Sequence, residues 1–286
     1  MKLGDEHPEP PVRIGITASP DRPKALSIAR VVHGLLEGRC ELFVADDTAR
    51  ALGLPGRPLR EFDGDVLIAV GGDGCLFYSA QAVEAPILGI NTGGVGFLSE
   101  VDPNGAELEG AVERLLSGKY FLEQRMMLST SIWEERLPDA LNDVVVHVKD
   151  VARMRAFEIL IDSRPVGRLR ADGIILSTPT GSTSYALSAG GPVVDPTVDA
   201  ILVTAIAPFA SAGRPLVVGP LKEVTIRLVG RPRSTIAVVD GYHEVELGEG
   251  VELKVFKSPR RTSLVRFSTE FFQRLRVRSI LSWDGP

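Results

Sequence analysis

An aspartate set among glycines is the feature of the chain with the clearest chemical meaning. Residues 65–74 read DVLIAVGGDG, an apolar run that ends at Gly71, Gly72, Asp73 and Gly74. Glycine amides can approach a phosphate closely, and an ionised carboxylate can accept a proton from a hydroxyl or hold a metal ion. The three glycines therefore fit a phosphate loop beside a catalytic aspartate. The same residues also fit a tight turn in which the aspartate caps the following helix.

Two further segments combine glycine with small polar residues. NTGGVGFL (91–98) follows the next apolar run, and TPTGSTSY (178–185) follows a later one. The second segment holds six hydroxyl side chains in eight positions, and its Tyr185 offers a flat face for stacking. We expect it to bind a sugar or a phosphate. The alternative is a loop that caps a short helix around 184–189.

Several familiar catalytic patterns are absent from the sequence. It contains no GxxxxGK[ST], GxGxxG, GxSxG or HExxH segment, which disfavours P-loop phosphoryl transfer, hydride transfer, serine hydrolysis and zinc peptidase chemistry. The four histidines stand singly, without the spacing of a metal site or a triad. Asn142 and Asp143 form a polar pair ahead of the apolar run VVVHV, which alone indicates only the turn that opens a strand.

The elements that must position these residues can be read from the apolar spacing. Strands are expected at 12–17, 41–45, 65–70 and 86–91, and helices at 22–37, 75–83 and 105–117. Strands that alternate with helices predict a doubly wound parallel sheet. Ligands of such sheets bind beyond the carboxyl ends of the strands, where both glycine-rich turns of this part of the chain lie.

Beyond about residue 120 the pattern changes to short β-rich runs separated by turn residues. They lie at 156–162, 165–169, 173–178, 223–229, 234–241, 243–250 and 251–256. This pattern is typical of an all-β second domain. A final helix is expected from Ser268, and its three arginines fit a solvated face better than a nucleic-acid surface.

The composition of the chain bounds its class and its partners. With 286 residues, 44% of them hydrophobic and 24% charged, it fits a globular protein of one large or two ordinary domains. A net charge of −5 disfavours a nucleic-acid partner. No stretch is long and apolar enough to span a membrane, and the N-terminus lacks an apolar export signal. Two widely separated cysteines fit the reducing cytoplasm.

Taken in this order, the segments resemble the NAD kinase family. The matching pieces are VGGDG (70–74), NTGGVGFL (91–98), ND (142–143), DGIILSTPTGSTSYALSAGGPVV (172–194), RPLV (214–217) and VDG (239–241). The resemblance runs from about residue 65 to the C-terminal region, and the long block 172–194 is its most specific part. It implies an α/β domain formed by residues 1–120 with 266–286, whose last helix returns to it, and a β-rich NAD-binding domain at 121–265.

The resemblance implies transfer of a phosphoryl group from ATP, another nucleoside triphosphate or polyphosphate to the 2′-hydroxyl of the adenosine ribose of NAD, giving NADP. Asp73 matches the general base, and Gly74 its dinucleotide-contacting neighbour. Further substrate-binding positions are matched by Phe97, Asn142, Asp143, Arg153, Arg170, Asp172, Thr183, Ser184, Tyr185, Ala186, Leu187, Ser188 and Tyr242. Mg²⁺ or another divalent cation is implied as the cofactor, held mostly by the donor phosphates. A homodimer or homotetramer is implied as the active form.

The chain departs from the family pattern at a few positions. Cys75 stands where threonine or asparagine is common, Tyr78 where many members are basic, and Tyr242 where glutamine or asparagine is frequent. Two other classes stay open. A lipid or sphingoid kinase shares the GGDG turn but does not need the 172–194 loop, and a catalytically silent dinucleotide sensor would keep the loop and lose Asp73. The apolar run 200–210 fits burial in a subunit contact.

Overall fold

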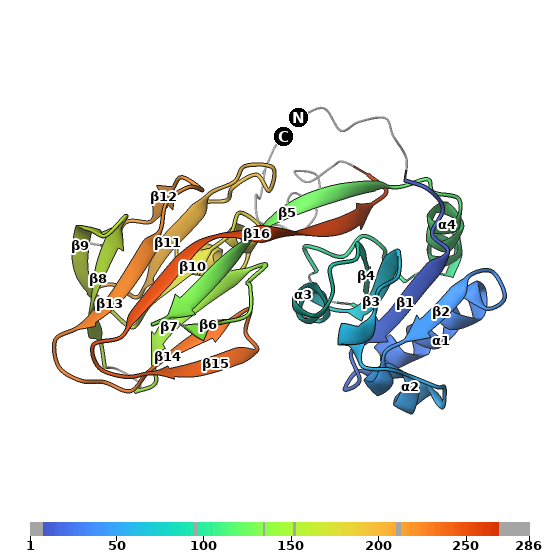
Figure 1. The fold of residues 1–286 in the computed structure, drawn as a ribbon, viewed down its shortest axis with the longest axis horizontal. Coiled ribbons are helices and arrows are strands. Elements are labelled where there is room, and N and C mark those ends of the chain that lie inside the picture. The colour runs from blue at the N-terminus through green and yellow to red at the C-terminus, as the bar shows by residue number, and fades with distance from the viewer. Residues whose placement is uncertain are drawn as a thin grey trace, which may run out of the picture. The chain divides into compact units, whose positions relative to one another are not determined.

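The computed structural model describes residues 8–93, 96–103, 105–133, 135–150, 153–209 and 213–268. The chain divides into two compact units, residues 1–124 with 262–286, and residues 125–261. It leaves the first unit within strand β5 (Phe121–Ile132) and returns to it within strand β16 (Glu252–Arg266), as the green and red strands of Figure 1 show.

The first unit is built on a parallel sheet in the strand order β2-β1-β3-β4. These strands are β1 (Arg13–Ala18), β2 (Glu41–Val44), β3 (Val66–Gly71) and β4 (Ile87–Asn91). The helices between and after them are α1 (Pro23–Leu36), α2 (Asp46–Leu52), the short η1 (Leu59–Glu61), α3 (Asp73–Ala82) and α4 (Gly105–Leu116). The end of β16 lies parallel to β4, with Leu264 opposite Ile87.

Helices cover both faces of this sheet because successive strand residues point to opposite sides. One set of alternate residues, including Ile14, Ile68 and Ile90, packs with α1 and α4 in a single buried cluster. The residues between them face the other way, where a side chain on Gly89 would collide with Leu76 of α3. The expected doubly wound parallel sheet is therefore confirmed.

The second unit consists of antiparallel strands. One sheet has the order β12-β11-β10-β7-β14-β15, and β13, β8 and β9 extend from β16 in the other. The bounds are β6 (Glu135–Arg136), β7 (Asp143–Val148), β8 (Arg155–Ile161), β9 (Arg164–Ala171), β10 (Gly173–Ser177), β11 (Ile201–Ile206), β12 (Leu216–Val218), β13 (Val224–Val229), β14 (Thr235–Val239) and β15 (His243–Leu247). A large apolar cluster packs inside the unit, and a smaller one forms around Val145, Ile175 and Ala186, so the all-β second part is confirmed.

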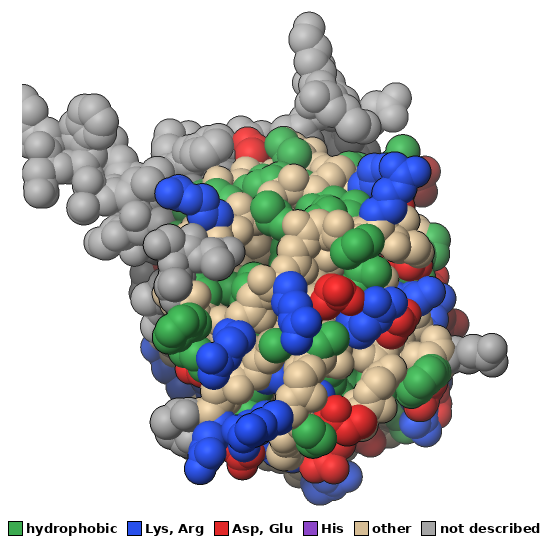
Figure 2. All heavy atoms as spheres, turned by 90° about the vertical axis from the view of Figure 1, so that its left-hand side faces the viewer, with side chains coloured by type: hydrophobic (Ala, Val, Ile, Leu, Met, Phe, Trp, Pro, Cys, Tyr) green, Lys and Arg blue, Asp and Glu red, His purple; other side chains and the backbone are tan. Residues whose placement is uncertain are grey.

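Strand β9 lies at the edge of its sheet, and its residue composition disfavours pairing with a strand of another chain. It holds a proline, Pro165, and three exposed arginines, Arg164, Arg168 and Arg170. Proline and charged side chains on an edge are known to discourage edge-to-edge association. On the face turned toward the viewer in Figure 2, basic side chains are interspersed with acidic and apolar ones.

The structure corrects two expectations. The apolar run 200–210 was expected to be buried in a subunit contact. Its residues 201–206 instead form β11, and Ile201, Leu202 and Val203 are buried within the chain's own sheet. Helix α3 begins at Asp73, two residues before the predicted start at Cys75. The helix expected after Ser268 lies outside the described residues.

Candidate functional site

The carboxyl edge of the parallel sheet contains a topological switch point between β1 and β3. The chain leaves β1 for β2 on one side and resumes with β3 on the other side of β1. Ligands of open α/β sheets bind in the crevice that such a reversal opens. Gly71 and Gly72 end β3 at this point, and Gly72 is the N-cap of α3.

Gly71 is required by the close approach of two segments. A Cβ at this position would lie 2.5 Å from Ser19 Oγ and 2.7 Å from the Cβ of Cys75. Burial raises the pKa of the Cys75 thiol to about 11, so this side chain packs as a neutral group. The residue that replaces the family's common threonine or asparagine therefore fills space beneath the loop without adding charge.

Asp73 lies in the first turn of α3 and is held from the neighbouring loop. Its Oδ2 accepts the backbone N–H of Phe97 at 2.7 Å, and its Oδ1 accepts that of Leu98 at 3.2 Å. The helix has Gly72 as its N-cap and no side-chain cap. The alternative in which Asp73 only caps a helix is therefore wrong. Two amides from the 96–99 segment orient the carboxylate instead.

Small and polar groups border the space beside this carboxylate. A Cβ on Gly96 would lie 3.2 Å from Ser99 Oγ, 3.4 Å from the amide carbon of Asn91 and 3.4 Å from Asp73 Oδ1. Ser99 is 6% exposed, and its hydroxyl has no hydrogen-bond partner among the described residues. Asn91 and Ser99 were not singled out from the sequence, although both lie in the predicted segment 91–98 or next to it.

In the second unit, Asn142 and Asp143 form a buried polar pair at the start of β7. The amide Nδ2 of Asn142 donates to Asp143 Oδ2 at 2.7 Å. Asp240 holds the turn in place, because its carboxylate accepts the backbone N–H groups of Leu141, Asn142 and Asp143 at 2.8–3.0 Å. Asp240, which sequence reasoning matched only as part of VDG, is thus the residue that fixes the pair.

Asp143 titrates in an unusual range. Burial, reinforced by the nearby charge of Asp240, raises its pKa to about 7, and the Asn142 amide only partly opposes this shift. Between about pH 4 and 7, the folded protein therefore retains a proton on Asp143 that the unfolded chain has released. The free energy of unfolding should fall as the pH rises through this window.

We expect Asp143→Asn to remove that pH-dependent decline, because an amide does not titrate. Urea unfolding of both proteins at several pH values between about 4 and 7.5 measures the difference. The wild-type free energy of unfolding should decrease relative to the variant as the pH rises. Parallel curves for the two proteins would show that Asp143 titrates normally.

The hydroxyl-rich loop after β10 lies beside this pair. Thr178 Oγ1 donates to Leu141 O at 2.7 Å, and Thr178 N donates to Asn142 O at 3.0 Å. Ser182 Oγ donates to Pro179 O at 2.6 Å and accepts the N–H of Val194 at 3.0 Å. The hydroxyls of Thr178, Ser182 and Thr183 therefore donate to backbone carbonyls of the loop or of the neighbouring segment.

The residues matched at 183–188 present a mixed surface. Thr183 and Ala186 are buried, Ser184 and Leu187 are half-buried, and Tyr185 and Ser188 are exposed. They form the short helices η2 (Gly181–Thr183) and α5 (Tyr185–Ser188), and Ser184 makes no side-chain cap to α5. Exposed Tyr242 follows Asp240 in the turn beyond β14. The structure thus brings together the Asn142–Asp143 pair, the loop 178–188 and Tyr242.

The remaining predicted residues lie at the opposite end of β10. Asp172 precedes this strand, and its N–H donates to Ile206 O at 3.0 Å. Arg170 ends the exposed part of β9 with its guanidinium 5.5 Å from the ring centre of Phe209, and Arg153 is exposed before β8. Five strand residues separate the two groups, a span of about 17 Å at roughly 3.3 Å per residue. The residues of this unit that were predicted to bind the dinucleotide therefore do not all lie at one end of the sheet.

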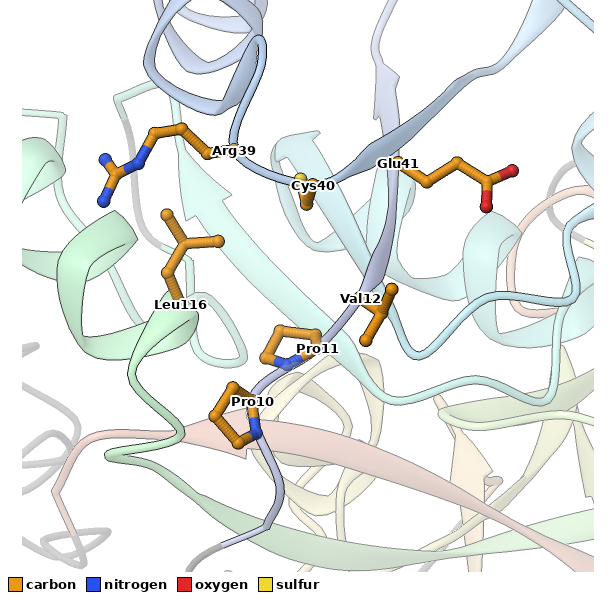
Figure 3. A pocket seen from close by; sticks show the side chains of 7 residues that line it. All are labelled: Pro10, Pro11, Val12, Arg39, Cys40, Glu41 and Leu116. Atoms are coloured by element: carbon orange, nitrogen blue, oxygen red, sulfur yellow. The ribbon is translucent and has the colours of Figure 1, made fainter.

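The described residues contain no group of three or more histidine, cysteine, aspartate or glutamate side chains arranged to hold a metal ion. In the same part of the chain, no helix has the length and apolar character needed to cross a membrane. A pocket of about 400 Å³ lies at the amino ends of β1 and β2, on the edge opposite Asp73. Its Arg39 and Glu41 point in opposite directions (Figure 3), and Arg39 is already paired with Glu113 at 2.6 Å.

The parallel sheet with its glycine-flanked aspartate and the β unit with its polar pair define a phosphotransferase of the α/β-plus-β type. The family model for the ATP-NAD kinase N-terminal domain matches residues 53–120, and that for the ATP-NAD kinase C-terminal domain matches residues 141–267. The chain is also 41% identical to the NAD kinase of Methanothermobacter thermautotrophicus over 278 residues, covering 94% of this chain and 96% of that protein. The chain belongs to the NAD kinase family, as the sequence motifs predicted.

Other similar proteins agree with this assignment. The NAD kinase of Thermococcus kodakarensis is 39% identical over 269 residues, with 91% of this chain and 96% of that protein covered. An Archaeoglobus fulgidus NAD kinase solved in complex with ATP has a TM-score of 0.74 and 28% identity, covering 92% of this chain and 96% of that one. Yeast NADH kinase complexed with NADH has a TM-score of 0.88, 24% identity and coverages of 97% and 90%, which shows a shared fold.

Proposed function

We propose that this enzyme transfers the terminal phosphoryl group of ATP to the 2′-hydroxyl of the adenosine ribose of NAD, with Asp73 as the general base. The observation that carries the assignment of the base is the fixed position of Asp73 at the carboxyl edge of the sheet, held by the amides of Phe97 and Leu98. ATP as the donor is supported by the similar Archaeoglobus fulgidus enzyme, which was solved with ATP.

The chemistry requires an oriented base. The backbone amides of Phe97 and Leu98 each donate to one oxygen of Asp73, which fixes the plane of the carboxylate. As the ribose oxygen forms its bond to the γ-phosphorus, the bond from that phosphorus to the β,γ-bridging oxygen breaks and ADP leaves. The hydroxyl proton passes to Asp73 and then to solvent. A positioned base contributes roughly 10²- to 10⁴-fold to such a step.

The donor also needs its phosphate charge neutralised, and the residues present fit a cation that arrives with ATP. Because the described residues contain no cluster of metal-ligating side chains, Mg²⁺ or another divalent cation would bind mainly to phosphate oxygens and water, with Asp73 as the nearby carboxylate. When bound, it would neutralise charge on the transferring group. Gly72 and Gly74 would leave room for the phosphates to approach the backbone, whereas Gly71, also expected in the phosphate loop, is buried against Ser19 and Cys75.

We assign NAD binding to the polar pair and the loop of the second unit. The side chains proposed to contact the dinucleotide are those of Asn142, Asp143, Thr183, Ser184, Tyr185, Ala186, Leu187, Ser188 and Tyr242, with Gly74 and Phe97 from the first unit. Exposed Tyr185 offers a ring for stacking, and the pair supplies one amide and one carboxyl for hydrogen bonds.

Replacing Asn142 with alanine is expected to weaken NAD binding by about 1–3 kcal/mol, the cost of leaving buried polar groups unpaired. The variant also strips the Asp143 carboxyl of its 2.7 Å amide partner. Isothermal titration calorimetry with NAD measures the change. Ser188→Ala, at an exposed position of the same loop, provides a milder comparison. Unchanged affinity in Asn142→Ala would assign the pair to a turn without a binding role.

We propose that the active form is a homodimer or homotetramer in which one copy completes the NAD site of another. The predicted contacts Arg153, Arg170 and Asp172 lie at the far end of β10 from Asn142 and Asp143, which suits contact with a dinucleotide bound to a second copy. Light scattering over a dilution series, run beside the activity assay, tests this. Full activity in a monomer would exclude it.

The assay that tests the proposed function incubates the purified protein with NAD, ATP and Mg²⁺ and measures NADP. NADP formation is expected, and its absence in a folded protein would contradict the proposal. Parallel reactions with polyphosphate, with NADH and with a sphingoid base distinguish the donor, the acceptor and the lipid-kinase alternative. We further propose a cytoplasmic location, since two free cysteines fit a reducing compartment.

A further inference from the structure

The loop that connects β1 to α1 carries two cations that no part of the predicted site accounts for. Arg22 is the N-cap of α1, and Lys24 lies in its first turn, with Pro23 between them. Both side chains are exposed. Neither forms an ion pair within the described residues, although Asp21 is adjacent to Arg22 in the sequence. Two cations without carboxylate partners lie near an edge of the sheet where helices begin.

Both cations lie over the glycine turns of neighbouring strands. A Cβ on Gly72 would be 3.3 Å from Nη1 of Arg22, and a Cβ on Gly93 would be 3.3 Å from Nζ of Lys24. Gly72 follows β3, and Gly93 follows β4. Arg22 and Lys24 follow β1 and lie next to the turns after β3 and β4, so they are close to the carboxyl ends of three adjacent strands.

Backbone hydrogen bonds hold this loop in place. The N–H of Ser19 donates to Val70 O at 3.0 Å, and the N–H of Arg22 donates to Ser19 O at 3.2 Å. On the next turn, the N–H of Thr92 donates to Gly71 O at 3.2 Å. The three turns are thus tied to one another, so the positions of Arg22 and Lys24 follow from the fold of the sheet and not from a loose surface loop.

The electrostatics of this edge favour an anion. Helix α3 directs its N-terminus, with the partial positive charge of the helix dipole, at the same switch point between β1 and β3. Glycine at positions 72 and 93 leaves the space under each cation free of side chains. The buried Ser99 hydroxyl without a partner, beside Asp73, is a second group at this edge that a ligand would satisfy. A polyphosphate carries the charge that two cations and a helix N-terminus complement.

We propose that Arg22 and Lys24 bind the phosphates of the nucleotide donor, Arg22 on the Gly72 side and Lys24 on the Gly93 side. This proposal rests on the proposed function, since it places the donor triphosphate beside Asp73. A guanidinium can bind two phosphate oxygens at once, whereas an ammonium acts as a point charge. Arg22 and Lys24 would thereby contact the phosphoryl donor, whereas the residues of the second unit are proposed to bind NAD.

The test compares Arg22→Met and Lys24→Met with Arg30→Met. Arg30 is an exposed residue of the same helix, α1, and is the matched control for losing one positive charge. We expect the KM for ATP to rise about 10- to 100-fold in the first two variants, the range for loss of one charge-assisted hydrogen bond. The KM for NAD should stay within about twofold of the wild type, and Arg30→Met should behave as the wild type.

Binding measurements separate this proposal from the proposed function. Titrating each variant with ATP and with adenosine should show a loss for ATP and none for adenosine, because the cations contact only phosphates. Arg22→Lys should retain part of the ATP affinity. Equal losses for ATP and adenosine, a loss confined to NAD, or unchanged ATP affinity would each overturn the assignment. A wild-type protein that binds ATP but yields no NADP would contradict the proposed function alone.

Discussion

Replacing Asp73 with asparagine is expected to lower kcat by at least about 100-fold while NAD remains bound. The substitution keeps the shape of the side chain but removes the charge that is proposed to accept the hydroxyl proton. Initial rates at saturating NAD and ATP measure the loss in kcat, and calorimetry with NAD measures retention of binding. A turnover near that of the wild type would show that another group removes the proton.

The variant needs a control because asparagine also alters the contacts of the loop. The carboxylate accepts two amides, from Phe97 and Leu98, whereas a carboxamide has one oxygen and would turn its NH₂ group toward one of them. Asp102→Asn makes the same change at an exposed carboxylate in the same segment, which accepts a 3.3 Å bond from the side chain of Asn91. Near-normal activity in Asp102→Asn would assign the loss in Asp73→Asn to the base.

Replacing Arg266 with methionine is expected to destabilise the protein by about 3–5 kcal/mol, because it leaves buried carboxylates without their cation. The Arg266 side chain is 2% exposed and binds Glu100 at 3.2 Å and Glu123 at 2.6 Å, which are 4% and 21% exposed. Urea unfolding measures the free energy change. Arg39→Met, which breaks an exposed pair with Glu113 in the same unit, should leave stability nearly unchanged.

The same arginine also connects stability with the reaction. Its Nη1 donates to the backbone O of Leu98 at 2.7 Å, and the N–H of Leu98 donates to Asp73. Loss of Arg266 should therefore loosen one of the two amides that orient the base. At a temperature where Arg266→Met is still folded, kcat should fall. A kcat equal to that of the wild type would show that the Leu98 amide is not needed to orient Asp73.

The elements that could be predicted from the sequence are those whose periodicity and boundaries are local. The apolar run that ends at the glycines indicated β3, and the spacing of residues 22–37 indicated α1, which spans Pro23–Leu36. By contrast, β5 and β16 are long strands that cross from one unit to the other, and β16 extends ten residues beyond the predicted run that ended at 256. Both contain consecutive polar or charged residues, at 123–125 and 260–263, which form strand only through pairing with distant partners and give no local strand pattern.

In the candidate site, too, some features could be predicted from the sequence and others could not. The type and spacing of residues 71–74 predicted a chemical role for Asp73, and the family pattern pointed to Asn142 and Asp143. What the sequence could not indicate was which distant groups hold them, since Asp240 lies nearly one hundred positions from the pair that it fixes. The reverse also occurred for the hydroxyl-rich loop, which was expected to offer its hydroxyls to a ligand. Thr178 instead donates to the backbone O of Leu141, and Ser182 donates to the backbone O of Pro179.

The hydrogen bonds made by the hydroxyls of this loop affect the entropy change on binding NAD. A loop whose hydroxyls already bind its own carbonyls and amides has lost its conformational freedom during folding, so little further ordering is needed when a ligand arrives. Recognition by such a loop approaches lock-and-key behaviour. The loss of entropy occurs once, when the free enzyme folds. If the exposed Tyr185 and Ser188 bind the dinucleotide as proposed, they would do so on a surface that is already ordered.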